Sequence, residues 1–559
     1  MPGRLLNGLF KKKDRGHGEA LVVPGDLEGQ IYIDQINQVV LASENLKRKT
    51  SFLEWLDDTR RHKNMRLVRV QWVPLSTVTD RLDHEHHAGG VHDEEAADEE
   101  VRDHALNLLR EAASWRATDI HIMRKDRHTE IQFRINGSLV TSNRFELDNT
   151  YADRLMRAMY SLGASRETAY SDLSFQDGSI AGDVLRGMGL SNVRIVRGPC
   201  FPVSEGGKFM VLRLQPAGEY ARKPAAPIKV DFRPPRRPPG KLRLESYGFS
   251  PEQIERLLNI VNAPSGILIC TGPTGSGKTT LLFELARNKA DMQPGRRLVT
   301  IEHPVELPMP WAIQLDIANT GGDSGRDAEA VGQAFRARQV TSLRMDPDDL
   351  VVGEIRDAEV ALTTFAAAQT GHFVMSTLHV DDPFDAPLRL RNLDYDRLNF
   401  GITCNASVVR GIVAQRLLPL LCPHCAQRWT VSDERMTRRA REAVLTWGDD
   451  PSAIRRMGPG CEHCNGTGIA GRTAVAEVVE TDEQLMSDFV EYGTAVARHR
   501  FRARKDVDPP MVETAMGRVF QGLVDPYTVT QTVDRIRARD VVVAEREAGA
   551  RHVRGEPRR

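Results

Sequence analysis

One short glycine-rich segment, Gly272-Pro-Thr-Gly-Ser-Gly-Lys-Thr279, constrains the fold of this chain more than any other part of it. It satisfies the whole pattern of a phosphate-binding loop. An apolar stretch, Gly266 to Thr271, precedes the loop, and a helix-like stretch, Lys278 to Lys289, follows it. This order of strand, loop and helix predicts the beginning of an α/β nucleotide-binding domain.

Each residue type in this loop has a chemical reason to be there. Glycines let consecutive backbone N–H groups curl around phosphate oxygens, and the following helix adds its positive N-terminal end. Lys278 is predicted to reach the β and γ phosphates of ATP, and Thr279 to ligate Mg²⁺. A chance glycine turn would explain neither the lysine nor the hydroxyl. The predicted nucleotide-binding residues are Gly272, Pro273, Thr274, Gly275, Ser276, Gly277, Lys278, Thr279 and Thr280.

A carboxylate follows a second apolar stretch farther along the chain. Residues 350–352 read Leu-Val-Val and are followed by Gly353 and Glu354. A carboxylate that leaves such a strand can face the γ-phosphate, where it polarises the attacking water or holds the hydrated metal. An exposed glutamate at the start of a helix is the alternative. Kinases, GTPases and motors share the phosphate loop, so the loop alone does not define the work that is done.

Two cysteine pairs predict a metal site. They are Cys422-Pro-His-Cys425 and Cys461-Glu-His-Cys464. Two C-x-x-C pairs at this separation suit a tetrahedral zinc site with four thiolate ligands, which leaves no open position for catalysis. We therefore predict a structural Zn²⁺ bound by Cys422, Cys425, Cys461 and Cys464, with His424 and His463 not needed. A redox disulfide pair is the competing interpretation.

Length and charge limit the classes of function. A chain of 559 residues predicts two to four domains. Because 76 basic and 76 acidic side chains cancel, no global field recruits nucleic acid. No run of about 20 apolar residues is present for a membrane-spanning helix, and the N-terminus lacks a signal-peptide core. We expect a cytoplasmic protein without direct nucleic-acid binding, whose membrane association is peripheral and made through partners.

The chain is predicted to contain five parts. Residues 1–100 carry few signals and end in an acidic, histidine-rich stretch, Asp80 to Asp103, which we interpret as a solvated linker rather than a metal site. An α+β domain with a tight turn at Asn136 and Gly137 follows. The expected ranges are 101–216 for this domain, 217–240 for a proline-rich linker, 241–540 for the nucleotide-binding domain and 541–559 for a charged tail. The zinc lobe is expected at about 418–468 within the nucleotide-binding domain, and the region after Asp433 is expected to be helical. The linker could also serve as a proline-rich ligand for a partner module.

Four further segments resemble the signature boxes of the type II secretion and type IV pilus assembly ATPases. In chain order they are Thr300-Ile-Glu-His-Pro-Val-Glu306, Leu343-Arg-Met-Asp-Pro-Asp-Asp349, Val352-Gly-Glu-Ile-Arg-Asp357 and Thr370-Gly-His-Phe-Val-Met-Ser-Thr-Leu-His379. The resemblance extends from about Val101 to about Arg535. It implies an α/β fold in which a smaller, PAS-like α+β domain precedes a RecA-like P-loop motor domain.

The resemblance also implies roles for individual residues. Glu354 would be the chief catalytic carboxylate, Glu302 would position water or metal, and His379 would sense the γ-phosphate. Arg194 and Arg213 lie in segments that resemble those carrying the family's arginine fingers; surface arginines on strands are the alternative. The chain departs from the family at His303, where aspartate is usual.

By the same resemblance, the chain is expected to form a homo-hexamer at an inner-membrane platform of a pilus or secretion system. There it would hydrolyse ATP to drive pilin or pseudopilin assembly, and the proline-rich linker would act as a hinge between the domains. Cysteine pairs of this kind accompany extension and secretion ATPases rather than retraction ATPases. The alternatives are a conjugation or DNA-transfer ATPase, which the cysteine pairs disfavour, and a nucleotide-regulated scaffold with weak hydrolysis.

Overall fold

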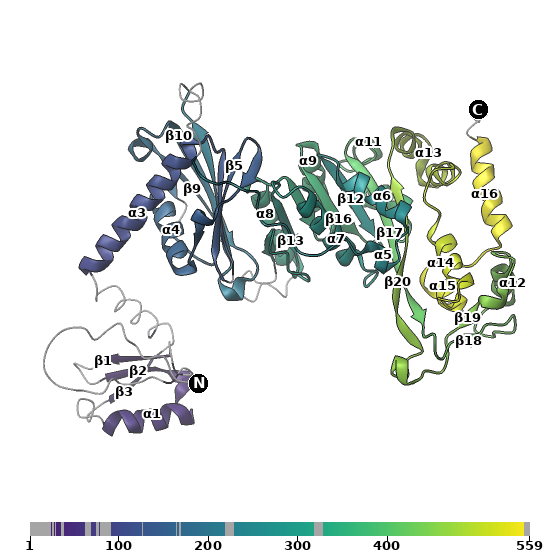
Figure 1. Ribbon diagram of the computed structural model, residues 1–559, viewed down its shortest axis with the longest axis horizontal. Helices are drawn as coiled ribbons and strands as arrows, with labels where there is room; N and C mark the ends of the chain where they lie inside the picture. The colour runs from purple at the N-terminus through teal and green to yellow at the C-terminus, as the bar shows by residue number, and fades with distance from the viewer. Residues whose placement is uncertain are drawn as a thin grey trace. The chain divides into compact units, whose positions relative to one another are not determined.

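The computed structural model divides the chain into two compact units, residues 1–104 and 105–559 (Figure 1). The residues that it describes are 24, 27, 30–34, 39–47, 49–61, 69–73, 78, 91–125, 127–163, 165–166, 169–218, 229–317 and 328–552. Among these residues, no helix is long and apolar enough to cross a membrane.

The first unit contains a small βαβ fold that the sequence analysis did not identify. Its sheet has the order β1-β2-β3, with β1 and β2 antiparallel and β2 and β3 parallel. The bounds are β1 Ile31–Asp34, β2 Val39–Ser43, α1 Thr50–Arg61 and β3 Arg69–Val73. Phe52 of α1 packs against Trp72 of β3, with ring centroids 5.4 Å apart, and against Trp55. These three large aromatic side chains supply much of a small core.

The acidic stretch expected to be a linker is partly helical. Helix α3 runs from Val91 to Ser114, so residues 91–103 of this stretch are helical. Residues 79–90, which include His84, His86 and His87, lie outside the described residues.

An α+β domain opens the second unit, as the sequence predicts. Its antiparallel sheet has the order β6-β5-β4-β11-β10-β9-β8, and β7 also pairs with β5. The bounds are β4 Asp119–Arg124, β5 Thr129–Ile135, β6 Ser138–Val140, β7 Glu146–Leu147, α4 Asn149–Ser161, β8 Ser165–Arg166, β9 Gln176–Ala181, β10 Leu190–Pro199 and β11 Lys208–Pro216. Asn136 and Gly137, both at positive φ, form the tight turn between β5 and β6.

The second domain of this unit is built on a seven-stranded sheet. The strand order is β14-β13-β15-β16-β12-β17-β20, and every pair is parallel except β17 with β20. The strands are β12 Gly266–Thr271, β13 Leu298–Glu302, β14 Ile313–Asp316, β15 Asp349–Val352, β16 Phe373–Leu378, β17 Val409–Leu421 and β20 Ile469–Glu480. This sheet and the glycine-rich loop after β12 confirm the predicted α/β class of P-loop fold.

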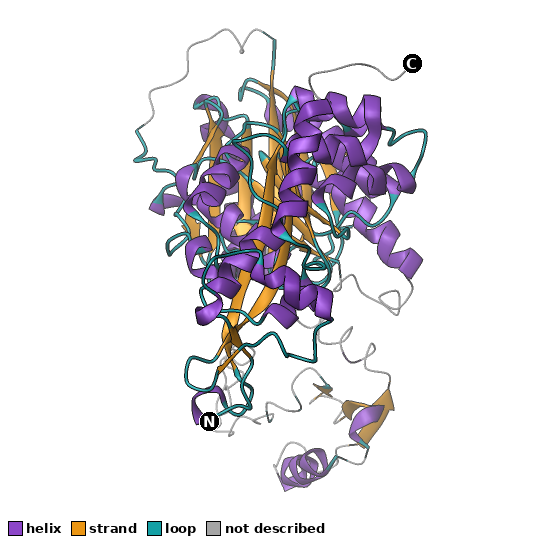
Figure 2. Cartoon of the chain, turned by 90° about the vertical axis from the view of Figure 1, so that its right-hand side faces the viewer, coloured by secondary structure: helices purple, strands orange, loops and turns teal. Residues whose placement is uncertain are grey.

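Helices cover both faces of the seven-stranded sheet (Figure 2). Along β12, Ile267 and Ile269 face one core, which includes residues of α8, α9, α10 and α13, while Leu268 and Cys270 face another, built with α5, α6 and α7. This alternation is the pattern expected of a strand buried on both faces. The helices are α5 Leu244–Tyr247, α6 Pro251–Val261, α7 Lys278–Met292, α8 Ala328–Ser342, α9 Ala358–Gln369, α10 Ala386–Leu393, α11 Phe400–Thr403 and α13 Glu483–Arg502.

The C-terminal region is not only helical, contrary to expectation. Strand β20 has 12 residues and pairs with the 13-residue β17 as a long antiparallel hairpin. Most side chains of β20 are buried on both faces, so its sequence lacks the polar and apolar alternation that marks a half-buried strand. The remaining elements are β18 Gln427–Arg428, α12 Arg438–Leu445, β19 Arg455–Arg456, α14 Met511–Phe520, α15 Pro526–Thr532 and α16 Arg539–His552.

The second half of the proline-rich segment is fixed to both domains. Residues 219–228 lie outside the described part. Beyond them, Phe232 packs edge-on against Trp115 of the α+β domain, with ring centroids 5.1 Å apart. Arg287 of α7 donates hydrogen bonds to the carbonyl oxygens of Pro239 and Lys241. Residues 229–240 are therefore not an open spacer, because one aromatic anchor and the helix after the phosphate loop hold them.

Candidate functional site

The glycine-rich loop lies between the end of β12 and the start of α7 at Lys278. The backbone φ angles of Gly272, Gly275 and Gly277 are 140°, 78° and 88°. Residues other than glycine rarely adopt such values. Gly272 and Gly277 also lack space, since a Cβ would lie 2.6 Å from the Gln415 carbonyl oxygen and 2.7 Å from Gln415 Nε2, respectively. The loop therefore needs glycine both for its conformation and for its contact with β17.

The loop has the features of a phosphate cradle. No side chain caps the N-terminus of α7, so its first amides are available to an anion. The Ser276 hydroxyl is buried and has no hydrogen-bond partner among the described residues. Lys278 Nζ donates to the carbonyl oxygens of Gly272 and Pro273 at 2.8 and 2.9 Å, and burial lowers the pKa of this lysine. These groups fit the phosphates of a nucleotide.

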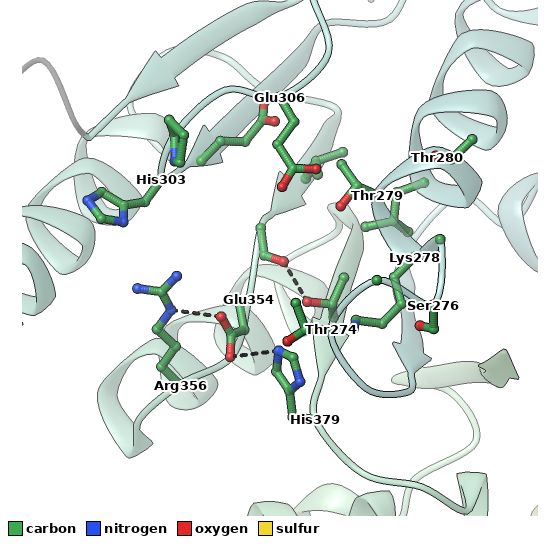
Figure 3. Close-up of a pocket in the computed structure, with 18 of the residues that line it drawn as sticks. Thr274, Ser276, Lys278, Thr279, Thr280, His303, Glu306, Glu354, Arg356 and His379 are labelled. Carbon is green, nitrogen blue, oxygen red and sulfur yellow. Dashed lines mark hydrogen bonds and ion pairs between the residues drawn. The ribbon is translucent and has the colours of Figure 1, made fainter. Parts of the chain in front are cut away.

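A cavity of about 580 Å³ opens above the loop (Figure 3). Its volume falls in the range of sites for small ligands and cofactors. The lining residues are Thr274, Gly275, Ser276, Gly277, Lys278, Thr279, Thr280, Leu282, Glu302, His303, Pro304, Glu306, Met309, Phe335, Val351, Gly353, Glu354, Arg356, Thr377, His379, Leu417 and Arg472. The structure thus brings the predicted residues of the loop together with Glu302, Glu354 and His379.

Glu354 is held by two neighbouring side chains at this cavity. Its Oε2 accepts a hydrogen bond from Arg356 Nε at 2.8 Å, and its Oε1 lies 3.3 Å from His379 Nε2. Glu354 follows β15 and His379 follows β16, so the carboxyl ends of two adjacent strands place them. Figure 3 shows Glu354 with these partners on one side of the cavity and Lys278 on the other.

Glu302 has a different environment. It ends β13, is 6% exposed, and accepts hydrogen bonds from Thr300 Oγ1 and from Gln314 Nε2, the latter at 3.0 Å. Burial raises the pKa of Glu302, although these hydrogen bonds oppose the shift. His303 and Glu306 also line the cavity. The signature box that contains His303 therefore still places a second carboxylate, Glu306, at the cavity. No role was predicted for Glu306 from the sequence.

The two arginines expected to act as fingers do not line the cavity. Arg213 donates from Nε to Asp119 at 2.9 Å and from Nη2 to Asp346 at 3.0 Å. Arg194 is exposed and lies directly opposite Arg213 on β10. Two other arginines line the cavity. Arg356 belongs to the signature box Val352 to Asp357, whereas Arg472 belongs to no motif that the sequence revealed.

Asp346 links the α+β domain to the nucleotide-binding domain. It accepts hydrogen bonds from His121 Nε2 at 3.0 Å, from Arg134 Nε and from Arg213 Nη2. Burial alone would raise the pKa of Asp346, but His121 and Arg134 lower it to about 2. His121 is fully buried, and this burial lowers its pKa to about 4. The second signature box thus serves as a contact between domains in this structure.

The four predicted cysteine ligands form one cluster, with all sulfur atoms within 4.8 Å of one another. Three of the Sγ pairs lie 3.7, 3.9 and 3.7 Å apart. A tetrahedral ion with Zn–S bonds of about 2.3 Å requires S to S distances of about 3.8 Å. Burial opposes ionisation of Cys464, yet N–H groups of Cys461 and Gly468 point at its sulfur and lower its pKa to about 6. The cluster fits a four-thiolate zinc site.

Cys422 directly follows β17, and Cys464 lies five residues before the start of β20 at Ile469. The cysteine cluster therefore lies at the end of the hairpin where the chain leaves β17 and enters β20. Glycines make the tight turns possible, because a Cβ on Gly458 would lie 1.8 Å from the Cys425 carbonyl oxygen. The rings of His424 and His463 stack on each other with centroids 3.7 Å apart. As expected, neither histidine belongs to the cluster.

A phosphate loop after a parallel strand, faced by a carboxylate from the adjacent strand ends, defines the class of P-loop nucleotide-binding proteins. Within this class, residues 94–535 match the family described as "Type II/IV secretion system protein", and the chain belongs to that family.

Similar proteins include two from secretion and pilus systems. The chain is 27% identical over 454 residues to the type IV pilus assembly ATPase PilB of Thermus thermophilus, which covers 80% of this chain and 43% of that protein. It is 31% identical over 382 residues to the type II secretion system protein HxcR of Pseudomonas aeruginosa, which covers 68% and 66%. The matched region spans less than two thirds of either relative. Among solved structures, the pilus retraction motor PilT with bound ADP matches 75% of this chain and 94% of its own at 20% identity and a TM-score of 0.35.

Proposed function

We propose that this chain is a cytoplasmic ATPase that assembles as a homo-hexamer on an inner-membrane platform and drives pilin or pseudopilin assembly. The observation that carries the proposal is the position of Glu354 across one cavity from Lys278, in a member of this family. The names of PilB and HxcR support a pilus or secretion system. The cysteine cluster, as a structural Zn²⁺ site, favours assembly over retraction.

Different residues of the cavity would have different roles in ATP hydrolysis. Lys278 would exchange the carbonyl oxygens of Gly272 and Pro273 for phosphate oxygens, and the Thr279 hydroxyl would ligate Mg²⁺, which neutralises phosphate charge when bound. Glu354 would orient the attacking water and accept its proton. Arg356 and His379 each contact one oxygen of this carboxylate. These contacts would keep Glu354 in a fixed position for the attacking water.

Arg194 and Arg213 keep their proposed role as arginine fingers only if the α+β domain moves. Arg213 is bound to Asp119 and Asp346, and neither arginine lines the cavity. The proposed hinge is the linker as a whole, residues 217–240, whose described part has one anchor on each domain: Phe232 packs against Trp115, and Pro239 accepts a hydrogen bond from Arg287. Release of Arg213 from Asp346 would be the first step of such a movement.

Steady-state ATPase assays on the purified protein test the proposal. We expect Glu354→Gln to lower turnover on the order of a hundredfold or more, as loss of a general base does, while nucleotide binding is retained. Lys278→Ala should lose both binding and turnover. The matched control is Glu359→Gln, because Glu359 is an exposed carboxylate on α9 that pairs with Arg397 at 2.8 Å. Wild-type turnover no higher than that of Glu354→Gln would contradict an ATPase and favour a scaffold.

A further inference from the structure

The chain leaves the nucleotide cavity directly after His379, and the residues that follow are held by contacts elsewhere. Within the cavity, His379 Nε2 lies 3.3 Å from Glu354 Oε1 (Figure 3). Asp381 and Asp382, two and three residues later, line a second cavity of about 900 Å³ that also reaches Pro273 of the phosphate loop. The contacts of these two aspartates therefore bear on the position of His379.

Asp381 is bound by an arginine that lies beside the phosphate loop. Arg416 of β17 donates from Nη2 to Asp381 Oδ1 at 2.8 Å and to the Asp381 carbonyl oxygen at 3.2 Å. The Arg416 side chain is only 5% exposed, and its Nη1 lies 3.1 Å from the position of a Cβ on Gly272. This pair fixes the start of the segment after His379 to the base of the phosphate loop.

Asp382 is bound by the C-terminal helix α13. Its Oδ2 accepts hydrogen bonds from Arg498 Nη1 at 3.1 Å and from Arg502 Nη2 at 3.2 Å. Its Oδ1 accepts a hydrogen bond from the Phe384 N–H at 2.9 Å and caps the short helix Pro383–Asp385. One oxygen of this carboxylate therefore holds the local turn, while the other makes charge-assisted hydrogen bonds to α13.

The same turn packs on α13 through a buried aromatic ring. Phe384 is 1% exposed, and its ring centroid lies 6.3 Å from that of Phe489 and 5.5 Å from that of Phe501. Between these two phenylalanines α13 is interrupted at Gly493, whose φ of 80° and ψ of 177° are not helical. Phe384 therefore contacts both halves of α13, and the ion pairs of Asp382 add two contacts to the second half.

We propose that Asp382 is a positioning residue for hydrolysis, because its ion pairs with α13 hold His379 where it contacts Glu354. The inference rests on the proposed function, since it concerns ATP turnover at the same site. Asp382 does not line the nucleotide cavity, so it acts through His379 and not on the nucleotide itself. The inference adds α13, which contains none of the four signature boxes, to the elements that set the rate of hydrolysis.

Steady-state ATPase assays on the full-length chain test this role with Asp382→Asn. Asparagine can still cap the turn, but it lacks the charge that binds the two arginines. We expect kcat to fall on the order of tenfold, because displacement of a group at the site slows the reaction. The KM for ATP and the affinity for Mg-ADP should stay unchanged, since the phosphate loop is intact.

Variants of Arg498 test the same ion pair from the side of α13. Arg502 is kept in these variants, because it also pairs with buried Glu477 at 2.6 Å. Arg498→Ala should lower kcat less than Asp382→Asn does, since Arg502 still binds Asp382. Arg498→Lys keeps the charge and should recover the wild-type kcat. No recovery in Arg498→Lys would overturn the role of the ion pair.

The matched control is Asp450→Asn. Asp450 caps the short helix Pro451–Ala453 by accepting a hydrogen bond from the Ser452 N–H at 2.8 Å, just as Asp382 caps its own turn. Asp450 is exposed and forms no ion pair with another residue of the described chain. Its substitution should therefore leave kcat and KM at the wild-type values.

Single-turnover assays in a His379→Ala background show whether Asp382 acts through His379. Two residues that act through one contact are not additive, so Asp382→Asn should lower the rate no further in this background. A further fall as large as in the wild-type background would overturn the positioning role alone. A raised KM with unchanged kcat, or a wild-type kcat in Asp382→Asn, would do the same. Absence of turnover in the wild-type protein would overturn the proposed function and the positioning role with it.

Discussion

At the scale of single residues, two carboxylates of the cavity have opposite surroundings. Glu354 lies between Arg356 and His379, whereas Glu302 is buried and hydrogen-bonded to Thr300 and Gln314. Burial raises the pKa of Glu302, because a carboxylate withdrawn from water loses stability in its charged form. Glu354, whose side chain is 26% exposed, is therefore better placed to meet the attacking water, and Glu302 is better suited to holding the geometry of its strand end.

The two variants Glu302→Gln and Glu354→Gln should differ accordingly in turnover. Glutamine at position 302 can still accept the two hydrogen bonds, so we expect a loss of turnover of less than about tenfold, against about a hundredfold or more at position 354. Turnover measured at saturating ATP checks this difference. A larger loss of turnover in Glu302→Gln than in Glu354→Gln would contradict the assignment of Glu354 as the general base.

Buried His121 predicts a loss of stability in mild acid. The pKa of His121 is lowered from 6.5 to about 4 in the folded chain, so the unfolded chain takes up a proton first as pH falls. The stability is complete above pH 6.5 and decreases between pH 6.5 and about 4, by up to about 3 kcal/mol. In His121→Gln, whose amide can still donate to Asp346, the melting temperature should fall less steeply over this interval. Parallel slopes for wild type and variant would contradict the assignment.

Residues that belong to a continuous sequence motif could be predicted from the local sequence alone. Lys278 begins the helix after the glycine-rich loop, and Glu354 closely follows an apolar strand, so spacing and residue type give both positions. Arg472 carries no such signal, because only the pairing of β20 with β17 brings it to the phosphate loop. The same limit applies to Arg213, whose binding to Asp346 depends on how two domains pack.

At the scale of elements, the β17 and β20 hairpin joins three regions. One face packs against α7 and the phosphate loop, and the other carries Leu418 and Val475 into a core with α14. Its far end holds the cysteine cluster. The sequence predicted the cluster from spacing but not the hairpin, since strands buried on both faces read as continuous apolar runs that resemble helices.

Loss of one cysteine should loosen the end of this hairpin. We expect Cys461→Ser to lose bound zinc and to lower the melting temperature, because a structural zinc contributes directly to folding free energy. Zinc content by elemental analysis and a thermal melt check the two effects. The control is His424→Ala, which lies between two ligands in sequence but outside the cluster and should keep its zinc. A zinc content unchanged in Cys461→Ser would contradict a four-thiolate site.

At the scale of the whole molecule, three strands of the α+β domain each send a side chain to Asp346. These are His121 of β4, Arg134 of β5 and Arg213 of β11. Arg134 also pairs with Asp348 at 2.8 Å, and Arg344 pairs with Asp177 of β9. Arg213 cannot bind Asp346 and a γ-phosphate at the same time. Any role of Arg213 as an arginine finger therefore requires that its hydrogen bond with Asp346 breaks.

Removal of Asp346 should therefore uncouple the two domains. Asp346→Ala leaves His121 and Arg134 buried without this partner, a change that costs about 3 kcal/mol or more when a buried ion pair is broken. We expect scanning calorimetry to show a lower melting temperature, with the α+β domain unfolding in a separate, earlier transition. Asp183→Ala is the matched control, because Asp183 forms an exposed pair with Arg186 and should leave the melt unchanged. A single transition at the wild-type temperature in Asp346→Ala would mean that other contacts, such as Arg344 with Asp177, hold the domains together, and that Arg213 can leave Asp346 at little cost.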